Sequence, residues 1–239
     1  MNSGSLRFTI AVPAYNEEKS ILQLLGQVKK YTSHRDDVEI LVINDGSKDQ
    51  TKQILESNSD LYSRLISHER NQGKGAAIIS ALREARGEFM LVQDADLEYS
   101  PVDYHKFFDF ADSMDVSIVI GSRLSAPSIT RVHYFWHKVG NKFITLFFNL
   151  IHNTTYTDIY CGYLMIRRAN LNPDLLKFRS WGQQAEILSF LSDKETGIYE
   201  VPVSYFGRSY TEGKKIRAKD TFLVLVATVY TKLRSARLK

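Results

Sequence analysis

Residues 89–101, FMLVQDADLEYSP, join an apolar run to three carboxylates, Asp94, Asp96 and Glu98, at alternate positions. A short apolar run bounded by polar residues is typical of a buried strand. Because a strand presents alternate residues to one side, the three carboxylates would converge if the extended backbone continued just past the strand end. Carboxylate oxygens suit Mg²⁺ or Mn²⁺, and such an ion completes its shell with phosphate oxygens and water. The alternative is a set of solvated loop acids, which an Asp-x-Asp motif by itself does not exclude.

Similar apolar runs surround this stretch and alternate with amphipathic segments. The runs occupy residues 7–13, 38–44, 63–69 and 116–122. The helix-like segments between them occupy residues 17–31, 47–58, 73–85 and 101–113. Alternation of strand and helix predicts an α/β fold in which a mostly parallel, doubly wound sheet is flanked by helices, with right-handed crossovers.

Polar clusters follow the first four strands of this pattern. They read PAYNEE, NDGSKDQT, RNQGKGAA and QDADLEY. Ligands of doubly wound sheets bind beyond the carboxyl ends of the strands. Asp45 would meet a ligand hydroxyl or base edge there, and Lys74 with Gly73 and Gly75 at a helix N-terminus would suit a phosphate. Each motif alone fits an ordinary turn or loop, but their placement at one edge of one sheet favours a ligand site.

The charge balance and the single cysteine limit the possible partners and compartment. The chain contains 31 Lys and Arg residues and 27 Asp and Glu residues, so its net charge is +4. This charge gives no reason to expect a nucleic-acid partner. Basic residues cluster from Arg208 to Lys239, which favours anionic phosphates or an anionic membrane surface. Because Cys161 is the single cysteine, the chain cannot form an internal disulfide, which fits a reducing compartment. Cys161 is expected to be a core residue.

Two apolar segments bear on membrane contact. Residues 1–18 lack the features of a signal peptide, and no apolar run is long enough to span a bilayer. Residues 132–151 predict an amphipathic helix with one apolar face and a second face on which Ile144 and Phe148 interrupt the polar residues. The apolar face contains Trp136, Val139, Phe143, Phe147 and Leu150. This helix is either interfacial or packed on the sheet, and residues 220–239 leave the same choice open. We expect a cytoplasmic protein in peripheral contact with a membrane.

Six motifs, taken in their order along the chain, resemble family 2 glycosyltransferases of the GT-A fold. They are VPAYNEE, INDGSKDQT, NQGKGAA, VQDADLEYSP, GSR and YEVPVSYFGRSYTEGKKI. The likeness is greatest to the polyprenyl-phosphate (dolichyl-phosphate) mannosyl- and glucosyltransferase branch, and extends from about Phe8 to about Ile216. It implies a Rossmann-like GT-A sheet in a single domain, residues 1–239. A nucleotide-sugar and metal-binding half would comprise residues 1–124, an acceptor-binding half residues 125–218, and an apolar and basic tail residues 219–239.

The resemblance also implies roles for individual residues of the donor site. Pro13, Tyr15 and Glu17 resemble the wall of the nucleotide pocket. Asp45 would face the base or ribose, and Lys74 would approach the nucleotide. The residues matching the family's metal-binding group, which bridges Mg²⁺ or Mn²⁺ to the diphosphate, are Asp94, Asp96 and Glu98.

Further positions match residues near the transferred group. Arg123 of the GSR motif resembles an arginine close to the donor and acceptor phosphates, with Asp158 near the donor. Arg208, Lys214 and Lys215 resemble a basic loop that closes over these phosphates. The expected catalytic residues are therefore Asp96, Arg123 and Arg208, together with Glu186, which resembles the acid that some hydroxyl-accepting relatives use as a base.

The resemblance implies an inverting glycosyltransferase. A hexose would move from a nucleotide diphosphate sugar, of the GDP-mannose or UDP-glucose type, to a polyprenyl phosphate at the membrane surface. A phosphate acceptor is already anionic and needs no general base, whereas a saccharide hydroxyl would need one, for which Glu186 is the candidate. Transfer to a saccharide hydroxyl, a non-catalytic nucleotide-sugar-binding module and a nucleotidyltransferase remain the alternatives.

Overall fold

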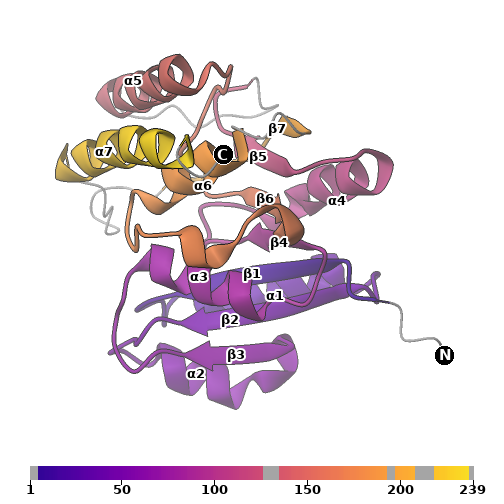
Figure 1. Ribbon diagram of the computed structural model, residues 1–239. Helices are drawn as coiled ribbons and strands as arrows, with labels where there is room; N and C mark the ends of the chain where they lie inside the picture. Colours follow the sequence, from indigo (N-terminus) through magenta and orange to yellow (C-terminus); the bar gives the residue numbers. More distant parts are fainter. Residues whose placement is uncertain (1–4, 126–134, 193–196, 208–217, 237–239) are drawn as a thin grey trace.

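The computed structural model describes residues 5–125, 135–192, 197–207 and 218–236 (Figure 1). Its strands are β1 Phe8–Ala14, β2 Val38–Asn44, β3 Arg64–Ser67, β4 Phe89–Val92, β5 Ile118–Ser122, β6 Leu164–Arg167 and β7 Ile198–Pro202. Its α-helices are α1 Ile21–Thr32, α2 Thr51–Ser57, α3 Lys74–Glu84, α4 Tyr104–Ser113, α5 Phe135–His152, α6 Gln183–Ser192 and α7 Ala218–Ser235. Short 3₁₀ helices occupy Ser59–Leu61, Pro101–Asp103, Arg168–Asn170 and Pro173–Leu175.

The strands form one seven-stranded sheet in the order β3-β2-β1-β4-β6-β5-β7. Parallel pairing joins β1 to β2 and β4, β2 to β3, and β5 to β7. Among the strands of the described residues, only β6 runs antiparallel to its neighbours, β4 and β5. The structure therefore confirms the predicted mostly parallel α/β sheet, including all five strands expected in the first half of the chain.

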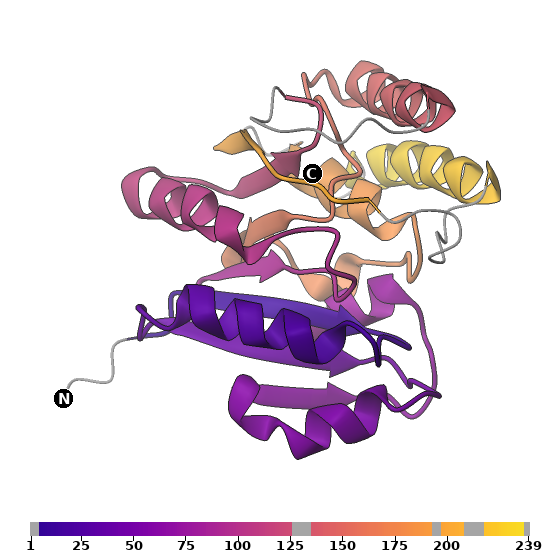
Figure 2. The ribbon, with the colours of Figure 1, turned by 180° about the vertical axis from the view of Figure 1, so that it is seen from behind.

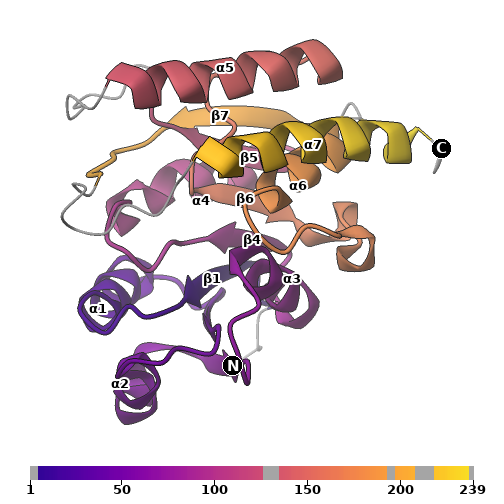
Figure 3. The ribbon, with the colours of Figure 1, turned by 90° about the vertical axis from the view of Figure 1, so that its left-hand side faces the viewer.

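Helices cover both faces of the sheet. Figure 3 views the sheet close to edge-on and shows α1, α2 and α4 on one side and α3 and α6 on the other. The reverse view in Figure 2 brings α1 and α2 to the front. Near β5 and β7, α7 packs against both α5 and α6. Strand β6, from the half of the chain that also forms α5, α6 and α7, lies between β4 and β5 of the first half.

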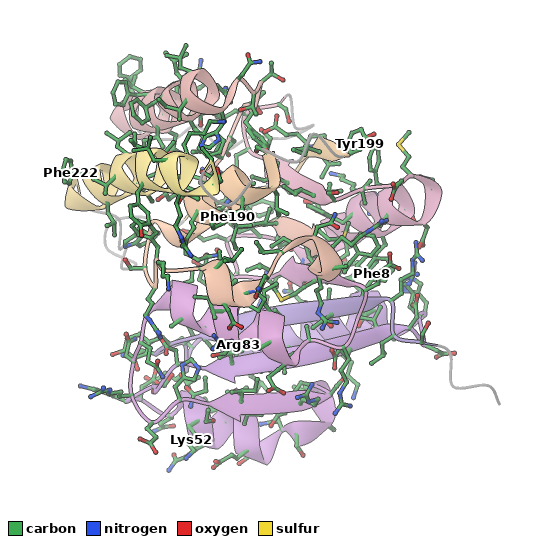
Figure 4. All side chains as sticks on the ribbon, viewed as in Figure 1. Phe8, Lys52, Arg83, Phe190, Tyr199 and Phe222 are labelled. Atoms are coloured by element: carbon green, nitrogen blue, oxygen red, sulfur yellow. The ribbon has the colours of Figure 1, made fainter. Side chains whose placement is uncertain are left out.

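The core explains why the apolar runs form central strands. All four residues of β4 are buried, and Phe8 of β1 is fully buried between the rings of Phe89 and Phe108, at centroid distances of 5.8 and 4.4 Å. Figure 4 labels Phe8 within this interior and Lys52 on the surface. A strand enclosed on both faces has no side for polar residues, so continuous apolar runs replace an alternating pattern.

Helix α5 contradicts one of the two sequence expectations, that its apolar stripe packs on the sheet. The interruptions of its polar face, Ile144 and Phe148, are the buried residues, and Phe148 stacks on His152 with a centroid distance of 4.4 Å. The apolar stripe expected to face the core is solvent-exposed at Val139, Phe143 and Leu150. The expectation that this stripe packs on the sheet is therefore wrong. The side chain of Trp136, expected on the same stripe, lies outside those that the structure describes.

No helix within the described part of the chain combines the length and hydrophobicity needed to cross a membrane.

Candidate active site

A cavity of about 360 Å³ opens at the carboxyl ends of β1, β2 and β4, where the sequence predicts a ligand site. The α3 N-terminus, from the same half of the molecule, and the segment leading into α6, from the other half, also line it. Nine predicted site residues line this cavity: Pro13, Tyr15, Glu17, Asp45, Lys74, Asp94, Asp96, Glu98 and Arg123. Arg208, Lys214 and Lys215 lie outside the described residues. The edge of the sheet thus gathers motifs that are far apart in sequence.

The loop after β1 is held in place by the loop after β2. Asn16 donates its backbone N–H to Ser47 Oγ at 3.1 Å and accepts the Lys48 N–H through Oδ1 at 2.8 Å. The Glu17 N–H donates to Thr51 Oγ1 at 2.9 Å. Asn16 has φ of 54°, a left-handed conformation that asparagine tolerates better than most residues. These contacts fix the adjacent wall residue Tyr15.

Asp45 shapes the loop that precedes α3. Its Oδ1 accepts the Gln72 N–H at 2.9 Å and lies 2.7 Å from His68 Nδ1, while Oδ2 accepts the Gly73 N–H at 2.8 Å. The side chain is almost fully buried although it lines the cavity. The sequence predicts that Asp45 contacts a ligand base or ribose. In the structure, both carboxylate oxygens instead accept hydrogen bonds from the loop before α3. Asp45 therefore positions the start of α3.

The α3 N-terminus brings a cation to the acidic turn. Gly73, at φ of 97°, precedes Lys74, the first residue of the helix, and a side chain on Gly73 would lie 2.5 Å from the Arg179 carbonyl oxygen. Lys74 Nζ lies 2.5 Å from Asp94 Oδ1. Gly162 leaves room for the Asp94 carboxylate, because a side chain there would meet Oδ2. A helix N-terminus with a lysine favours anionic groups, so this corner suits a phosphate.

The three carboxylates after β4 share the cavity but not the expected geometry. Strand β4 ends at Val92, residues 95–96 form a turn, and Leu97 adopts φ of 62°. Convergence by strand alternation is therefore a wrong expectation. Glu98 accepts the Tyr205 hydroxyl through Oε2 at 2.9 Å. Among the described residues, no three His, Cys, Asp or Glu side chains form a group that could hold a metal ion by themselves. Asp94 and Asp96 remain two hard oxygen donors on the cavity wall.

Arg123 is fixed by a buried ion pair. Its Nε and Nη2 donate to the two carboxylate oxygens of Asp158 at 2.7 and 2.9 Å, and its guanidinium lies 5.1 Å from the Tyr205 ring centroid. Burial alone would lower the pKa of Arg123, but Tyr99 and Asp158 raise that pKa well above its ordinary value. Arg123 therefore presents a permanent positive charge to the cavity. Asp158 contributes to the site through Arg123.

Glu186 does not line the cavity. Its side chain is fully buried, and its carboxylate oxygens accept the backbone N–H groups of Lys177 and Phe178 at 2.9 to 3.0 Å. Arg234 Nη1 of α7 lies 3.9 Å from Oε1. The expectation of a carboxylate facing an acceptor hydroxyl does not match this placement. Glu186 instead fixes the 177–178 segment against the first turn of α6.

Glu186 gives a prediction on pH. Burial raises its pKa above 4.5, and the hydrogen bonds from Phe178 and Lys177 offset only part of this effect. The folded state therefore binds the proton more tightly than the unfolded state, and this stabilising contribution is lost as pH rises above the unfolded pKa. Glu186→Gln removes the titration. In thermal melts, we expect the difference between the Tm of wild type and the Tm of the variant to decrease as the pH is raised from 4 to 8. A constant difference would contradict the assignment. Glu84→Gln, on the surface of α3, is the control.

Several cavity residues were missed by sequence reasoning. They are Tyr99, Tyr160, Gly162, Ser180, Trp181, Gln183, Gln184 and Tyr205. Tyr160 donates its hydroxyl to the Trp181 carbonyl oxygen at 2.6 Å, which joins the segment before β6 to the segment before α6. Their sequence signal is weak because aromatic and amide residues are common in ordinary loops.

Cys161 is buried as expected, and burial raises its pKa to about 12.

Comparison with known proteins adds to this geometry. The model of the family "Glycosyl transferase family 2" matches residues 9–172. The chain is similar to a dolichyl-phosphate beta-glucosyltransferase of Trichomonas vaginalis, with 28% identity over 82% of this chain and 63% of that protein. A dolichyl-phosphate beta-glucosyltransferase of Mus musculus is 27% identical over 90% of this chain and 71% of its own length. The chain thus spans only part of the length of these relatives.

Solved structures with low sequence identity share the fold. Glucosyl-3-phosphoglycerate synthase from Mycobacterium tuberculosis, in complex with Mn²⁺, uridine diphosphate and phosphoglyceric acid, superposes with a TM-score of 0.72 at 16% identity, covering 96% of this chain and 79% of that one. TarS of S. aureus, in complex with UDP-GlcNAc, gives 0.65 at 18% identity, covering 94% and 66%. These likenesses establish a GT-A architecture. With the family match covering more than half of its length, the chain belongs to glycosyl transferase family 2.

Proposed function

We propose that this glycosyltransferase moves a hexose from a nucleotide diphosphate sugar to a polyprenyl phosphate, with inversion at the anomeric carbon. The observation that carries the proposal is one cavity in which Asp94 and Asp96 lie with the cations Lys74 and Arg123. That combination suits a diphosphate, which is anionic and binds divalent cations. The relatives named dolichyl-phosphate beta-glucosyltransferases support the acceptor class, and solved structures with uridine diphosphate support the donor class.

Asp94 and Asp96 fit a Mg²⁺ or Mn²⁺ ion that also binds the donor diphosphate. Such an ion takes one or two protein carboxylates and fills its other positions with phosphate oxygens and water. When bound, the metal would stabilise the negative charge that develops on the departing nucleoside diphosphate. Lys74 holds Asp94 in the present structure, and in the complex its charge would be shared with the diphosphate. Asp94, Asp96 and Lys74 are thus assigned to the leaving group.

The acceptor would approach the anomeric carbon from the face opposite the leaving group. Arg123 carries a permanent charge and is held by Asp158, so it can orient an anionic acceptor without gaining or losing a proton. A phosphate monoester is already a nucleophile at neutral pH. Since Glu186 is turned away from the cavity, a phosphate acceptor accounts for the site better than a saccharide hydroxyl. The basic loop containing Arg208, Lys214 and Lys215 is proposed to close over the phosphates.

Lipid extraction after the transfer reaction tests this proposal. Purified protein, Mg²⁺ or Mn²⁺, a short polyprenyl phosphate and radiolabelled UDP-glucose or GDP-mannose should give label in the organic phase. Omission of the polyprenyl phosphate is the control and should leave that phase unlabelled. Label transferred only to a water-soluble saccharide would move the acceptor to a hydroxyl, and release of pyrophosphate would indicate a nucleotidyltransferase. Absence of turnover with every donor would favour a binding module.

Helices α5 and α7 are proposed to contact the membrane that carries the acceptor. Most of the large hydrophobic side chains that the described residues expose lie on these two helices, which pack against each other. On α5 they are Phe135, Val139, Phe143, Leu146 and Leu150. On α7 they are Phe222, Val226, Val229, Tyr230 and Leu233. Figure 4 shows Phe222 projecting outward. Lys138 and Lys142 lie exposed on α5 and would favour an anionic, cytoplasmic membrane face.

Charge on this face should weaken binding to vesicles. Leu146 and Leu150 are 57% and 74% exposed, so replacing both with Glu changes the surface and not the core. Burial of a leucine in an apolar phase contributes roughly 1.5–3 kcal/mol, and we therefore expect at least about a 10-fold loss of affinity for vesicles that contain anionic lipid, measured by co-sedimentation. Leu22→Glu on α1, at a site 47% exposed, is the control. Equal sedimentation of the α5 variant and wild type would contradict membrane contact through this face.

A further inference from the structure

We propose that Gln183 binds a hydroxyl group of the donor hexose, an inference that rests on the proposed transfer reaction. Gln183 lines the cavity although only 3% of the residue is exposed. Its Nε2 is buried and has no hydrogen-bond partner in the part of the chain that the structure describes. A buried amide N–H without a partner costs folding free energy, and such groups are rare in native proteins. A ligand acceptor in the cavity would provide the partner that the described residues do not.

The neighbouring amide shows what a purely structural glutamine looks like in this segment. Gln184 also lines the cavity, but its Nε2 donates to the carbonyl oxygens of Ile159 and Cys161 at 2.9 and 2.6 Å. Those two bonds tie α6 to the loop before β6. Among the described residues, Nε2 of Gln184 is therefore hydrogen-bonded within the protein, whereas Nε2 of the adjacent Gln183 has no partner.

The position of Gln183 indicates which part of the donor it would contact. A side chain on Gly75, in the first turn of α3, would lie 2.8 Å from the Gln183 Cβ, so Gln183 packs beside the helix end that carries Lys74. A diphosphate at that helix end would place the attached sugar close by. The carboxamide is neutral and would not neutralise a phosphate, but it both donates and accepts hydrogen bonds, as a sugar hydroxyl does. Gln183 is accordingly assigned to the hexose and Lys74 to the diphosphate.

Gln183→Met tests the assignment, because Met keeps the length of the side chain and removes its polar atoms. Calorimetric titrations in Mg²⁺ would compare UDP with UDP-glucose, and GDP with GDP-mannose, on the wild type and on the variant. We expect the variant to bind the nucleoside diphosphate within about 2-fold of wild type and the matching sugar donor about 10- to 100-fold more weakly. This range follows from the loss of one hydrogen bond to a buried group.

Deoxy donors identify the hydroxyl group. With analogues of the bound donor lacking the 2-, 3-, 4- or 6-hydroxyl, wild type and Gln183→Met should bind one analogue equally, because neither complex then contains the hydrogen bond. Gln184→Met is the matched variant. We expect it to lower the Tm, and any loss of binding affinity that it causes should be the same for every donor. The inference would be overturned if Gln183→Met and wild type bound the sugar donor with equal affinity. It would also be overturned if Gln183→Met bound the nucleoside diphosphate and the sugar donor more weakly by the same factor. If wild type bound neither nucleotide nor sugar donor, the proposed function would fail as well.

Discussion

Replacing Asp96 with Asn is expected to abolish hexosyl transfer while leaving the fold intact. Asp96 lines the cavity, and its Oδ1 accepts the Glu98 N–H at 3.1 Å, a bond that the asparagine oxygen can still accept. What the variant loses is one negative charge where a divalent cation and a diphosphate would meet. Loss of a group that stabilises charge in the transition state costs about 10²- to 10³-fold, and a metal ligand is expected to reach or exceed the upper end of this range.

The measurement is the initial rate of transfer at saturating donor and at Mg²⁺ concentrations up to saturation. Asp174→Asn is the control, since Asp174 is an exposed carboxylate paired with Arg83 on the surface. Its rate should equal that of wild type. Thermal melts of both variants should lie close to wild type, which would separate a lost ligand from a lost fold. An Asp96→Asn protein with wild-type kcat at saturating Mg²⁺ would remove Asp96 from the proposed chemistry.

The sheet and its ligand edge could be predicted because strong local signals and topology agree. The runs that became β1, β2 and β4 are apolar at nearly every position, and a parallel sheet buries both faces of its strands. Once the strands are parallel, their carboxyl ends meet at one edge, so Pro13, Asp45 and Asp94 had to lie near one another. That inference needs no knowledge of any single side-chain contact.

Other expectations failed where a tertiary contact decides the outcome. Hydrophobic periodicity identified an apolar stripe on α5, but it cannot tell whether protein or another phase covers that stripe, and the helix is buried through Ile144 and Phe148. A glutamate in a helical pattern gave no sign that backbone N–H groups eight and nine residues earlier would bind it, as happens at Glu186. The turn at Leu97 likewise precedes a contact between Glu98 and Tyr205, which are far apart in sequence.

The largest expected effect on stability comes from Asp158. Its side chain is fully buried and accepts two hydrogen bonds from the Arg123 guanidinium, whose side chain is 14% exposed. Asp158→Asn leaves the guanidinium buried without its counter-charge. Removing one partner of a buried ion pair typically costs about 3–5 kcal/mol, which for a chain of this length corresponds to a fall in Tm of roughly 10 °C. Urea unfolding followed by tryptophan fluorescence, and thermal melts, measure the two quantities.

A double variant separates the cost of the unpaired charge from the value of the pair. Arg123→Met leaves Asp158 unpaired and should also destabilise the protein strongly, whereas Arg123→Met combined with Asp158→Leu removes both charges. Because much of each single loss is the cost of burying a lone charge, the double variant should unfold at a higher urea concentration than either single variant. It should still be inactive, since the cavity then lacks the cation that orients the acceptor phosphate. Additive losses in the double variant would mean that the two residues act independently, and Arg123 would then lose the fixed orientation on which its proposed role depends.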